Sequence, residues 1–342
     1  MVTKTIPYFN LRKIMNSGQI FRMYEPEVGR FVVFSGNKRL ELYQHFDHSD
    51  GEKEQGTEIG TVDFMCSQKE FDEYWEDYFD LKRDYGAIVQ LAQAHYDKVK
   101  KSESLAIKEG INGAEFLKKS CEYGADIRVL KQDIWEMMIS FIISQQKQIP
   151  SIRKCIEALC ERFGEKHSTW YGFPTPESIA SAGPDGVKGL SLGYRERYIY
   201  ETAVKYLIDG IPDDKLRIMP ADEVKKYLCS FTGIGDKVAD CVALFGVGLV
   251  DSFPIDVHIK DILYREFVSD KDKLRIGKNI KNRNLSSETI KSSQDTKDLP
   301  RKKLLDSISY SDYMQIISDN FSVFDGIKGI VQQWIFAYEI AK

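Results

Sequence analysis

Hydrophobic and polar residues alternate as in β-strands near the start of the chain. Two short apolar runs, at 31–34 and 40–43, are typical of strands, and a glycine- and asparagine-containing turn signal at 35–38 separates them. The polar, glycine-bearing stretch 49–60 is typical of a loop. We therefore expect residues 8–64 to form a small antiparallel sheet.

The pattern becomes helical from Gln68 onwards, where aromatic residues recur at the spacing of one helix face. Apolar stripes separated by short turns predict several helices between 133 and 267, among them one at about 194–208. A strongly apolar helix is predicted at about 326–341. The fold class is therefore α+β, with a small N-terminal sheet domain that includes helices and an all-helical domain after it.

These patterns place the N-terminal α+β domain at 1–125 and the helical domain at 126–342. Residues 270–310 are poor in apolar side chains and rich in Lys, Asn and Ser. This composition predicts a basic, partly disordered insertion within the helical domain.

Composition indicates an ordinary globular protein with no membrane partner. The chain has 342 residues, 42% of them hydrophobic, and its apolar runs are too short to span a bilayer. The segment Met1–Pro7 lacks the apolar core of a signal peptide. The sequence therefore predicts a cytoplasmic enzyme, associated with the nucleoid, or a nuclear one if the source is eukaryotic. Nothing in it indicates more than a monomer.

Six scattered cysteines form no CxxC pair, which disfavours a zinc ribbon and predicts free thiols. The net charge is −4, but the charge is unevenly distributed. Eleven acidic and two basic residues lie between 50 and 80, against four acidic and eleven basic between 271 and 303. A DNA-binding face needs only local positive charge, so the total does not exclude nucleic acid. Solvated surface remains the alternative interpretation of both charge runs.

The most informative motif is a glycine-rich turn containing Gly233 and Gly235. Two glycines two residues apart allow backbone amides to point outward, and the following helix adds the positive end of its dipole. Such a turn can hold one phosphate without reading sequence. A plain helix–helix turn is the alternative, but Leu228, Phe231 and Ile234 around it resemble a helix-hairpin-helix DNA-binding element at about 221–247.

A lysine and an aspartate follow this turn. Lys237 lies in a first helical turn, where the dipole disfavours an ammonium and favours a nucleophilic amine. Asp256 precedes an amphipathic helix, so it is expected to cap that helix, and a rigid carboxylate can also stabilise a sugar cation. Taken singly, a surface lysine and a simple N-cap remain the alternatives.

Together these residues resemble the helix-hairpin-helix DNA glycosylases, and from about Tyr8 onwards, outside 270–310, the chain resembles the 8-oxoguanine DNA glycosylase/lyase family. Five segments carry the resemblance: Phe9-Asn-Leu-Arg12, Asn16-Ser-Gly-Gln-Ile-Phe-Arg22, Leu192-Gly-Tyr-Arg-Glu-Arg-Tyr198, Thr232-Gly-Ile-Gly-Asp-Lys-Val-Ala-Asp-Cys241 and Phe253-Pro-Ile-Asp-Val-His258.

The resemblance implies a role for each matching residue. Lys237 would attack the sugar and form a Schiff base, and Asp256 would steady the developing positive charge. The Gly18 carbonyl would read the base, Cys241 and Phe336 would stack on its faces, and Gln332 would bond its Watson–Crick edge. DNA contacts would come from Gln146, Lys147, Tyr194, Arg195, Gly233, Gly235 and His258. Backbone carbonyls of Cys229, Phe231 and Ile234 would ligate a structural cation.

Two positions depart from the family pattern. Gln146 stands where an asparagine usually fills the gap left by the flipped base, and Gln145-Gln146 also resembles the alkylbase glycosylases. Ser151 stands where eukaryotic members have an arginine that reads the opposite cytosine, and serine is too short for that contact. We therefore expect a relaxed preference for the opposite base, with Arg195 retaining some of it.

The predicted function is that of a bifunctional repair enzyme. It would flip an oxidised purine out of duplex DNA, excise it through a lysine Schiff base and cleave the strand by β-elimination, with no cofactor required. Two alternatives remain: a monofunctional alkylbase glycosylase that uses Asp256 and water, and a non-catalytic DNA-binding module that uses the hairpin alone. Lys237 disfavours the first alternative, and Lys237 together with Asp256 disfavours the second.

Overall fold

The computed structural model describes residues 1–46, 60–101, 111–269, 272–273, 275–277, 279–280 and 301–342. The loop predicted at 49–60, except Gly60, and most of the basic insertion predicted at 270–310 lie outside these residues; Gly60 begins a strand. At its end the insertion contributes helix α17 (Arg301–Ser307), where Arg301 pairs with Asp261 at 2.7 Å.

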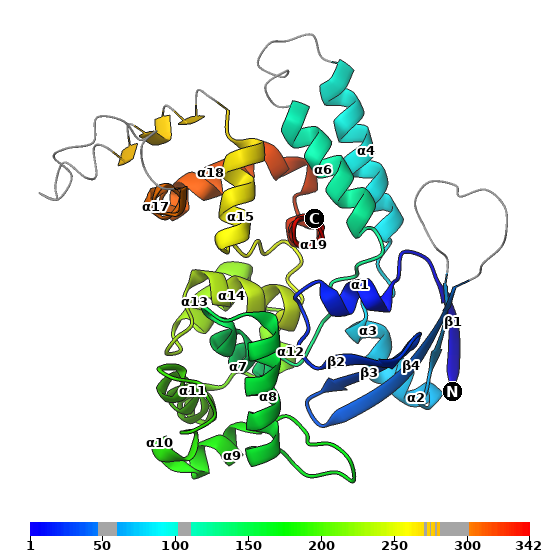
Figure 1. Cartoon of the computed structure of the whole chain (residues 1–342), viewed down its shortest axis with the longest axis vertical. Helices are drawn as coiled ribbons and strands as arrows, with labels where there is room; N and C mark the ends of the chain where they lie inside the picture. The colour runs from blue at the N-terminus through cyan, green and yellow to red at the C-terminus, as the bar shows by residue number, and fades with distance from the viewer. Residues whose placement is uncertain (47–59, 102–110, 270–271, 274, 278, 281–300) are drawn as a thin grey trace, which may run out of the picture.

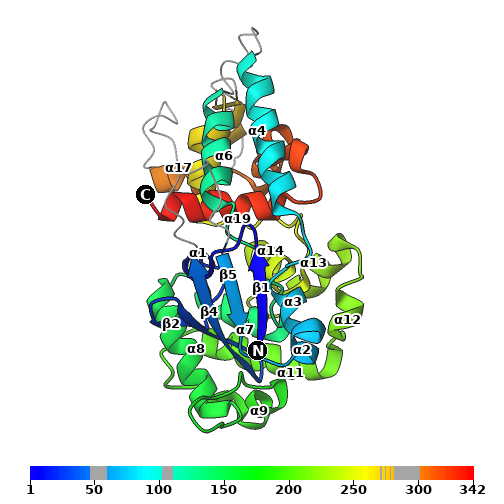
Figure 2. The ribbon, with the colours of Figure 1, turned by 90° about the vertical axis from the view of Figure 1, so that its right-hand side faces the viewer.

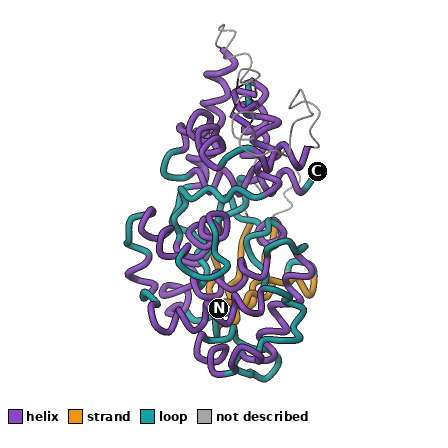
Figure 3. Tube along the Cα trace, turned by 90° about the vertical axis from the view of Figure 1, so that its left-hand side faces the viewer, coloured by secondary structure: helices purple, strands orange, loops and turns teal. Residues whose placement is uncertain are grey.

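A five-stranded antiparallel sheet forms one side of the lower half of the molecule (Figures 1 and 3). Its strand order is β1-β5-β4-β3-β2. The bounds are Val2–Ile6 (β1), Met23–Glu27 (β2), Arg30–Ser35 (β3), Lys38–Phe46 (β4) and Gly60–Phe64 (β5). The tight turn joins β3 to β4 with Ser35 opposite Lys38, which confirms the strands and turn predicted there.

The aromatic stripe after Gln68 packs under this sheet, as its helical spacing predicts. It forms the short segments α2 (Gln68–Glu70), η1 (Phe71–Trp75) and α3 (Glu76–Tyr78). Phe64 of β5 meets Phe71 and Phe79 edge-on, with ring centroids 4.9 and 5.8 Å apart. This burial of aromatic surface holds the sheet to the rest of the molecule.

Apart from α1 (Leu11–Asn16), which packs on strand β2, the remaining helices build the all-helical part of the α+β fold. They are α4 (Tyr85–Lys101), α6 (Ile111–Gly124), α7 (Ile134–Ser144), α8 (Ile149–Phe163), α9 (Pro176–Ser181), α10 (Gly183–Gly186), α11 (Arg195–Asp209), α12 (Asp213–Leu216), α13 (Ala221–Cys229), α14 (Asp236–Val242), η2 (Ala243–Val247), α15 (Val257–Ile262), η3 (Leu263–Phe267), α18 (Tyr310–Phe321), η5 (Ser322–Phe324) and α19 (Lys328–Ile340).

The division at residue 125 differs from the arrangement in space. Helices α4 and α6 precede it, yet both lie in the upper half beside α15, α18 and α19, away from the sheet (Figures 1 and 2). The reason is close packing of α6 on α19, where a Cβ on Gly124 would lie 2.4 Å from the Trp334 side chain. The sheet domain of the first 125 residues therefore excludes these two helices.

All six cysteines are free thiols. Within the described ranges, no helix has both the length and the apolar character needed to cross a membrane.

Candidate active site

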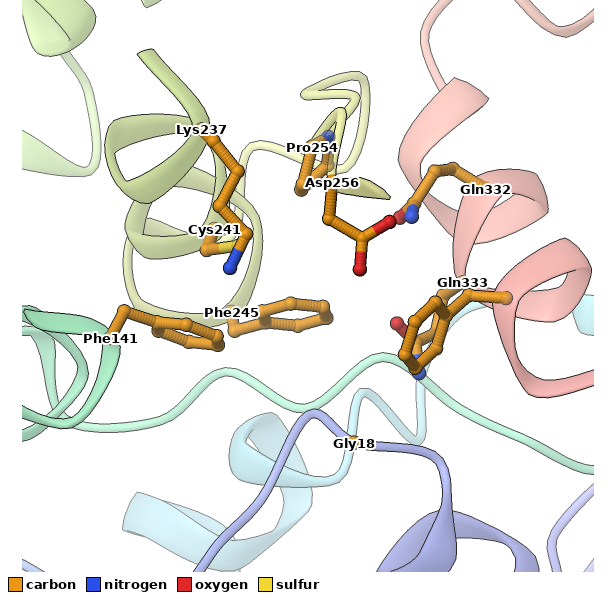
Figure 4. Close-up of a pocket in the computed structure, with 10 residues that line it drawn as sticks. Gly18, Phe141, Lys237, Cys241, Phe245, Pro254, Asp256, Gln332 and Gln333 are labelled. Carbon is orange, nitrogen blue, oxygen red and sulfur yellow. The ribbon is translucent and has the colours of Figure 1, made fainter. Parts of the chain in front are cut away.

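A small cavity of about 60 Å³ collects the residues predicted to do chemistry and to read a base (Figure 4). It lies where the loop after α1, helices α7, α14 and η2, the N-terminus of α15 and helix α19 meet. The lining comprises Gly18, Phe141, Lys237, Cys241, Phe245, Pro254, Asp256, Gln332, Gln333 and Phe336. The fold thus brings together all six residues predicted for catalysis and base recognition, from opposite ends of the chain.

Lys237 lies in the first turn of α14, whose N-cap is Gly235. Its side chain is half-buried and extends along the cavity wall, with Nζ 5.2 Å from the centre of the Phe141 ring. Stacked rings of Phe141 and Phe245, 5.7 Å apart, form the floor beneath it. The amine is therefore held at a water-poor surface and points toward the cavity.

Asp256 caps α15, as its sequence position predicts. The Ile259 backbone N–H donates to its Oδ1 at 2.8 Å, and this hydrogen bond fixes the carboxylate. The carboxylate points into the cavity, facing the Lys237 amine across it and beside Gln332 (Figure 4). A fixed negative charge there can stabilise positive charge that develops on a bound sugar.

Cys241 lies one helical turn after Lys237 and is buried. Burial raises the pKa of its thiol to about 11, although the neighbouring Lys237 side chain acts in the opposite direction. At neutral pH the sulfur is therefore an uncharged, polarizable surface suited to contact with a flat ring.

Helix α19 provides the opposite wall. Gln332 is 4% exposed, and its Oε1 has no hydrogen-bond partner among the described residues. Buried acceptors are normally paired, so this atom is available to a ligand donor. Phe336 lies against Gly18, where an added Cβ would be 2.9 Å from its ring, and the φ of +81° at Gly18 also requires glycine.

The helix-hairpin-helix prediction is met by α13 and α14 and the turn between them. Gly233 has φ +84°, and a Cβ there would lie 2.5 Å from Tyr198. The Gln145 side chain donates to the Gly233 carbonyl at 2.9 Å, which joins the hairpin to the loop after α7. Gly235 has an ordinary backbone and open space around it. Only Gly233 is therefore required by its conformation.

Four other residues predicted to contact DNA lie outside the cavity lining and are exposed or half-buried. Tyr194 is 48% exposed, and His258 is exposed with its ring 5.9 Å from that of Phe336. Lys147 donates to the Ser191 carbonyl at 2.9 Å. Gln146 has φ +52°, a strained conformation for a residue other than glycine and one common at functional sites.

Two family models account for most of the chain. The first, the 8-oxoguanine DNA glycosylase N-terminal domain, matches residues 1–138, and the second, the HhH-GPD superfamily of base excision DNA repair proteins, matches 139–283. The chain belongs to the 8-oxoguanine DNA glycosylase family. Lys237, Asp256 and the hairpin described above lie in the second matched region.

Individual proteins similar to this chain support the same family. An N-glycosylase/DNA lyase of Saccharomyces cerevisiae is 35% identical over 157 residues, covering 41% of this chain and 42% of the relative. One from Arabidopsis thaliana is 26% identical over 200 residues, covering 52% and 54%. The aligned region thus spans about half the length of these curated relatives.

Solved structures share the whole fold. MBOgg1 in complex with a low-affinity DNA ligand is 27% identical and matches over 100% of both chains with a TM-score of 0.66. The apo-form of the Clostridium acetobutylicum 8-oxoguanine glycosylase/lyase is 24% identical, covers 98% of both chains and has a TM-score of 0.67. The latter likeness supports the fold alone.

The Arg195 side chain, predicted to contact DNA, is held by backbone groups in this structure. The side chain is only 6% exposed, and its guanidinium donates to the backbone carbonyls of Leu192 and Gln145. It also stacks on Tyr194, with 4.3 Å between the guanidinium carbon and the ring centre. Arg195 therefore joins two loops of the protein, and its predicted DNA contact stays a prediction.

The three carbonyls predicted to hold a cation lie at the end of α13 and in the hairpin turn. The Phe231 carbonyl accepts the Ile234 N–H at 3.1 Å, which keeps the turn compact. The cation site itself stays a prediction. Across the described ranges, no three His, Cys, Asp or Glu side chains gather in a way that suits a metal ion.

Sequence reasoning assigned no site role to four residues of the cavity wall, Phe141, Phe245, Pro254 and Gln333. Phe141 and Phe245 lie on apolar helix faces. A residue that lines a pocket and a residue that packs in the core give the same apolar pattern, so the sequence could not distinguish them. Gln333 follows Gln332 directly and is 2% exposed, so a second glutamine in a strongly apolar helix was the available signal.

Proposed function

We propose that this protein is a bifunctional DNA glycosylase that excises 8-oxoguanine from duplex DNA and then cleaves the strand. The observation that supports this most is the single cavity shared by an amine on α14, a fixed carboxylate on α15 and a free amide acceptor on α19. These three groups match the nucleophile, the charge stabiliser and the base-edge reader that such a reaction needs.

The reaction begins with a flipped nucleotide in the cavity. The Lys237 nitrogen uses its lone pair to form a bond to C1′ as the bond between C1′ and the base breaks. The base leaves with that electron pair and takes up the proton that the newly bonded nitrogen releases. Asp256 stabilises the positive charge on the sugar between these events. Ring opening gives a Schiff base, loss of a C2′ proton follows, and the C3′–oxygen bond breaks with the phosphate as leaving group.

Recognition depends on one hydrogen. An oxidised guanine carries a hydrogen on N7, where guanine has only a lone pair. A carbonyl at Gly18 gains a hydrogen bond with the lesion and meets repulsion with guanine, a difference of roughly 1–3 kcal/mol. Cys241 and Phe336 provide the two surfaces between which the base would stack.

The first prediction concerns Lys237→Gln. The variant should bind lesion DNA but lose excision and strand cleavage by roughly 10³-fold or more, because the nucleophile is gone. Borohydride should trap a covalent complex with the wild type and none with the variant. Lys119→Gln, on the exposed face of α6 and outside the cavity, is the matched control and should trap like the wild type.

Trapping by the Lys237→Gln variant would contradict the assignment. Base release by the wild type without any trapped complex would indicate the monofunctional alkylbase reaction. DNA binding without either activity would indicate a binding module.

The second prediction concerns the opposite base. Ser151 is exposed and short, and Arg195 is buried, so neither side chain offers the bidentate fork that reads cytosine. Single-turnover excision of 8-oxoguanine opposite cytosine, adenine, guanine and thymine should differ by less than about tenfold, because the missing contact is worth ~1–3 kcal/mol. A strict requirement for cytosine would refute this expectation.

A further inference from the structure

Gln332 and Gln333 are neighbours on α19 with different surroundings. The Gln332 side chain is the predicted reader of the base edge, and the Gln333 side chain contacts the loop that carries Gly18. Its Nε2 donates to the Ser17 carbonyl at 2.6 Å, and the side chain is 2% exposed. In Figure 4 it extends from α19 toward the segment that carries Gly18. A buried hydrogen bond of this kind fixes the orientation of the Ser17–Gly18 peptide plane.

The residue after Gly18 is fixed independently from the other side. Gln19 is fully buried, and its Nε2 donates to Ser17 Oγ and to the Arg128 carbonyl, both at 3.0 Å. Its Oε1 accepts the Leu130 N–H and its backbone carbonyl accepts from Gln132, both at 2.8 Å. Four hydrogen bonds thus hold Gln19 in place.

The Gly18–Gln19 peptide, which carries the Gly18 carbonyl, therefore lies between two fixed peptide planes, those of Ser17–Gly18 and Gln19–Ile20. Glycine has the widest choice of backbone conformations, and Gly18 has φ +81°. Its carbonyl direction follows from the planes on either side. Release of the Ser17 plane would let that carbonyl swing, and hydrogen-bond strength falls steeply with angle.

We propose that Gln333 is a positioning residue that aims the Gly18 carbonyl at N7 of the damaged base. The inference rests on the proposed 8-oxoguanine activity and deepens it. Phe336 lies three residues further along the same helix and packs on Gly18. One helix thereby sets the base-edge amide, the stacking ring and the aim of the carbonyl together.

Two variants of similar size separate the hydrogen bond from packing. Gln333→Met fills the space without a donor and leaves the Ser17 carbonyl unpaired. Gln333→Glu keeps a donor while its carboxyl is protonated, a form that burial beside a carbonyl favours. Each full-length protein is tested on two duplexes, one with 8-oxoguanine opposite cytosine and one with an abasic site, which needs Lys237 but no base reading.

Gln333→Met should lower single-turnover excision of 8-oxoguanine on the order of tenfold, and leave abasic-site cleavage within about twofold of the wild type. Gln333→Glu should excise close to wild-type rates at low pH. Its rate relative to the wild type should fall as pH rises, because the ionised carboxylate repels the Ser17 carbonyl.

Equal losses on both duplexes would show a merely structural role and overturn the proposal. Unchanged excision by Gln333→Met, or a Gln333→Glu ratio that does not depend on pH, would overturn it as well. A wild type that cleaves abasic sites but leaves 8-oxoguanine intact would refute the proposed lesion, and with it this inference. If the wild type excises 8-oxoguanine normally and Gln333→Met does so at the same rate, only the role of Gln333 is refuted and the proposed function stands.

Discussion

Lys237 and Asp256 each belong to the start of a helix and also face the cavity. Lys237 lies over the Phe141 ring in a first helical turn, and Asp256 caps α15 while its carboxylate faces the cavity. The motif at 232–241 and the aspartate at 256 were sufficient to predict both. Gln333 was not predictable, because its partner Ser17 lies 316 residues away and only the tertiary fold shows that contact.

At Asp256 the capping and catalytic roles can be separated. Asn is as good an N-cap as Asp, so Asp256→Asn should keep the hydrogen bond to Ile259 and the thermal midpoint. It should lower excision roughly 10²-fold, because the charge is lost. Asp256→Ala should lower excision similarly and also reduce the free energy of unfolding by ~1 kcal/mol.

Single-turnover kinetics and chemical denaturation measure the two effects. Wild-type excision by Asp256→Asn would show that the carboxylate is only a cap.

At the scale of elements, the hairpin α13–α14 was predicted from its glycines, but the sequence did not show which glycine is required. The structure distinguishes them, since Gly233 is left-handed and packed on Tyr198, and Gly235 is neither. The strands β3 and β4 could also be predicted from the sequence, because the alternation of apolar and polar residues and the residues of the turn are local signals. The packing of α6 on α19 could not be predicted from the sequence, because it depends on a contact between Gly124 and Trp334, which are far apart in the chain.

The two hairpin glycines form a matched pair. Gly233→Ala should lower the free energy of unfolding by ~1–2 kcal/mol, because a Cβ at positive φ is strained and meets Tyr198. Gly235→Ala should change it by less than about 0.5 kcal/mol. Urea denaturation of both variants compares them directly, and equal effects would contradict the turn conformation described here.

At the scale of the whole molecule, the cavity lies where the sheet domain, the hairpin and the C-terminal helix meet. The sheet domain also contacts the helical part through a buried acid: Glu136 on α7 accepts the Gly36 N–H of the β3–β4 turn at 2.7 Å. Burial raises the pKa of Glu136 to about 8 from an ordinary value of 4.5. The folded protein therefore binds this proton more tightly than the unfolded chain.

This contact predicts a pH-dependent stability. Between about pH 4.5 and 8 the folded state holds a proton that the unfolded state releases, so stability falls as pH rises through that window. Glu136→Gln keeps an acceptor for Gly36 without a titrating group. Its thermal midpoint should match the wild type near pH 5 and exceed it near pH 8.5. Midpoints that stay parallel across this range would contradict the buried, protonated acid.

The central claim is that one amine becomes covalently linked to the sugar, and the position of that link tests it most directly. Wild-type protein should be reduced with borohydride on an 8-oxoguanine duplex, digested with nuclease and protease, and analysed by peptide mass spectrometry. The account predicts a sugar remnant on the peptide that contains Lys237, at Nζ of that residue. A remnant on another lysine, or on the N-terminal amine, would contradict it.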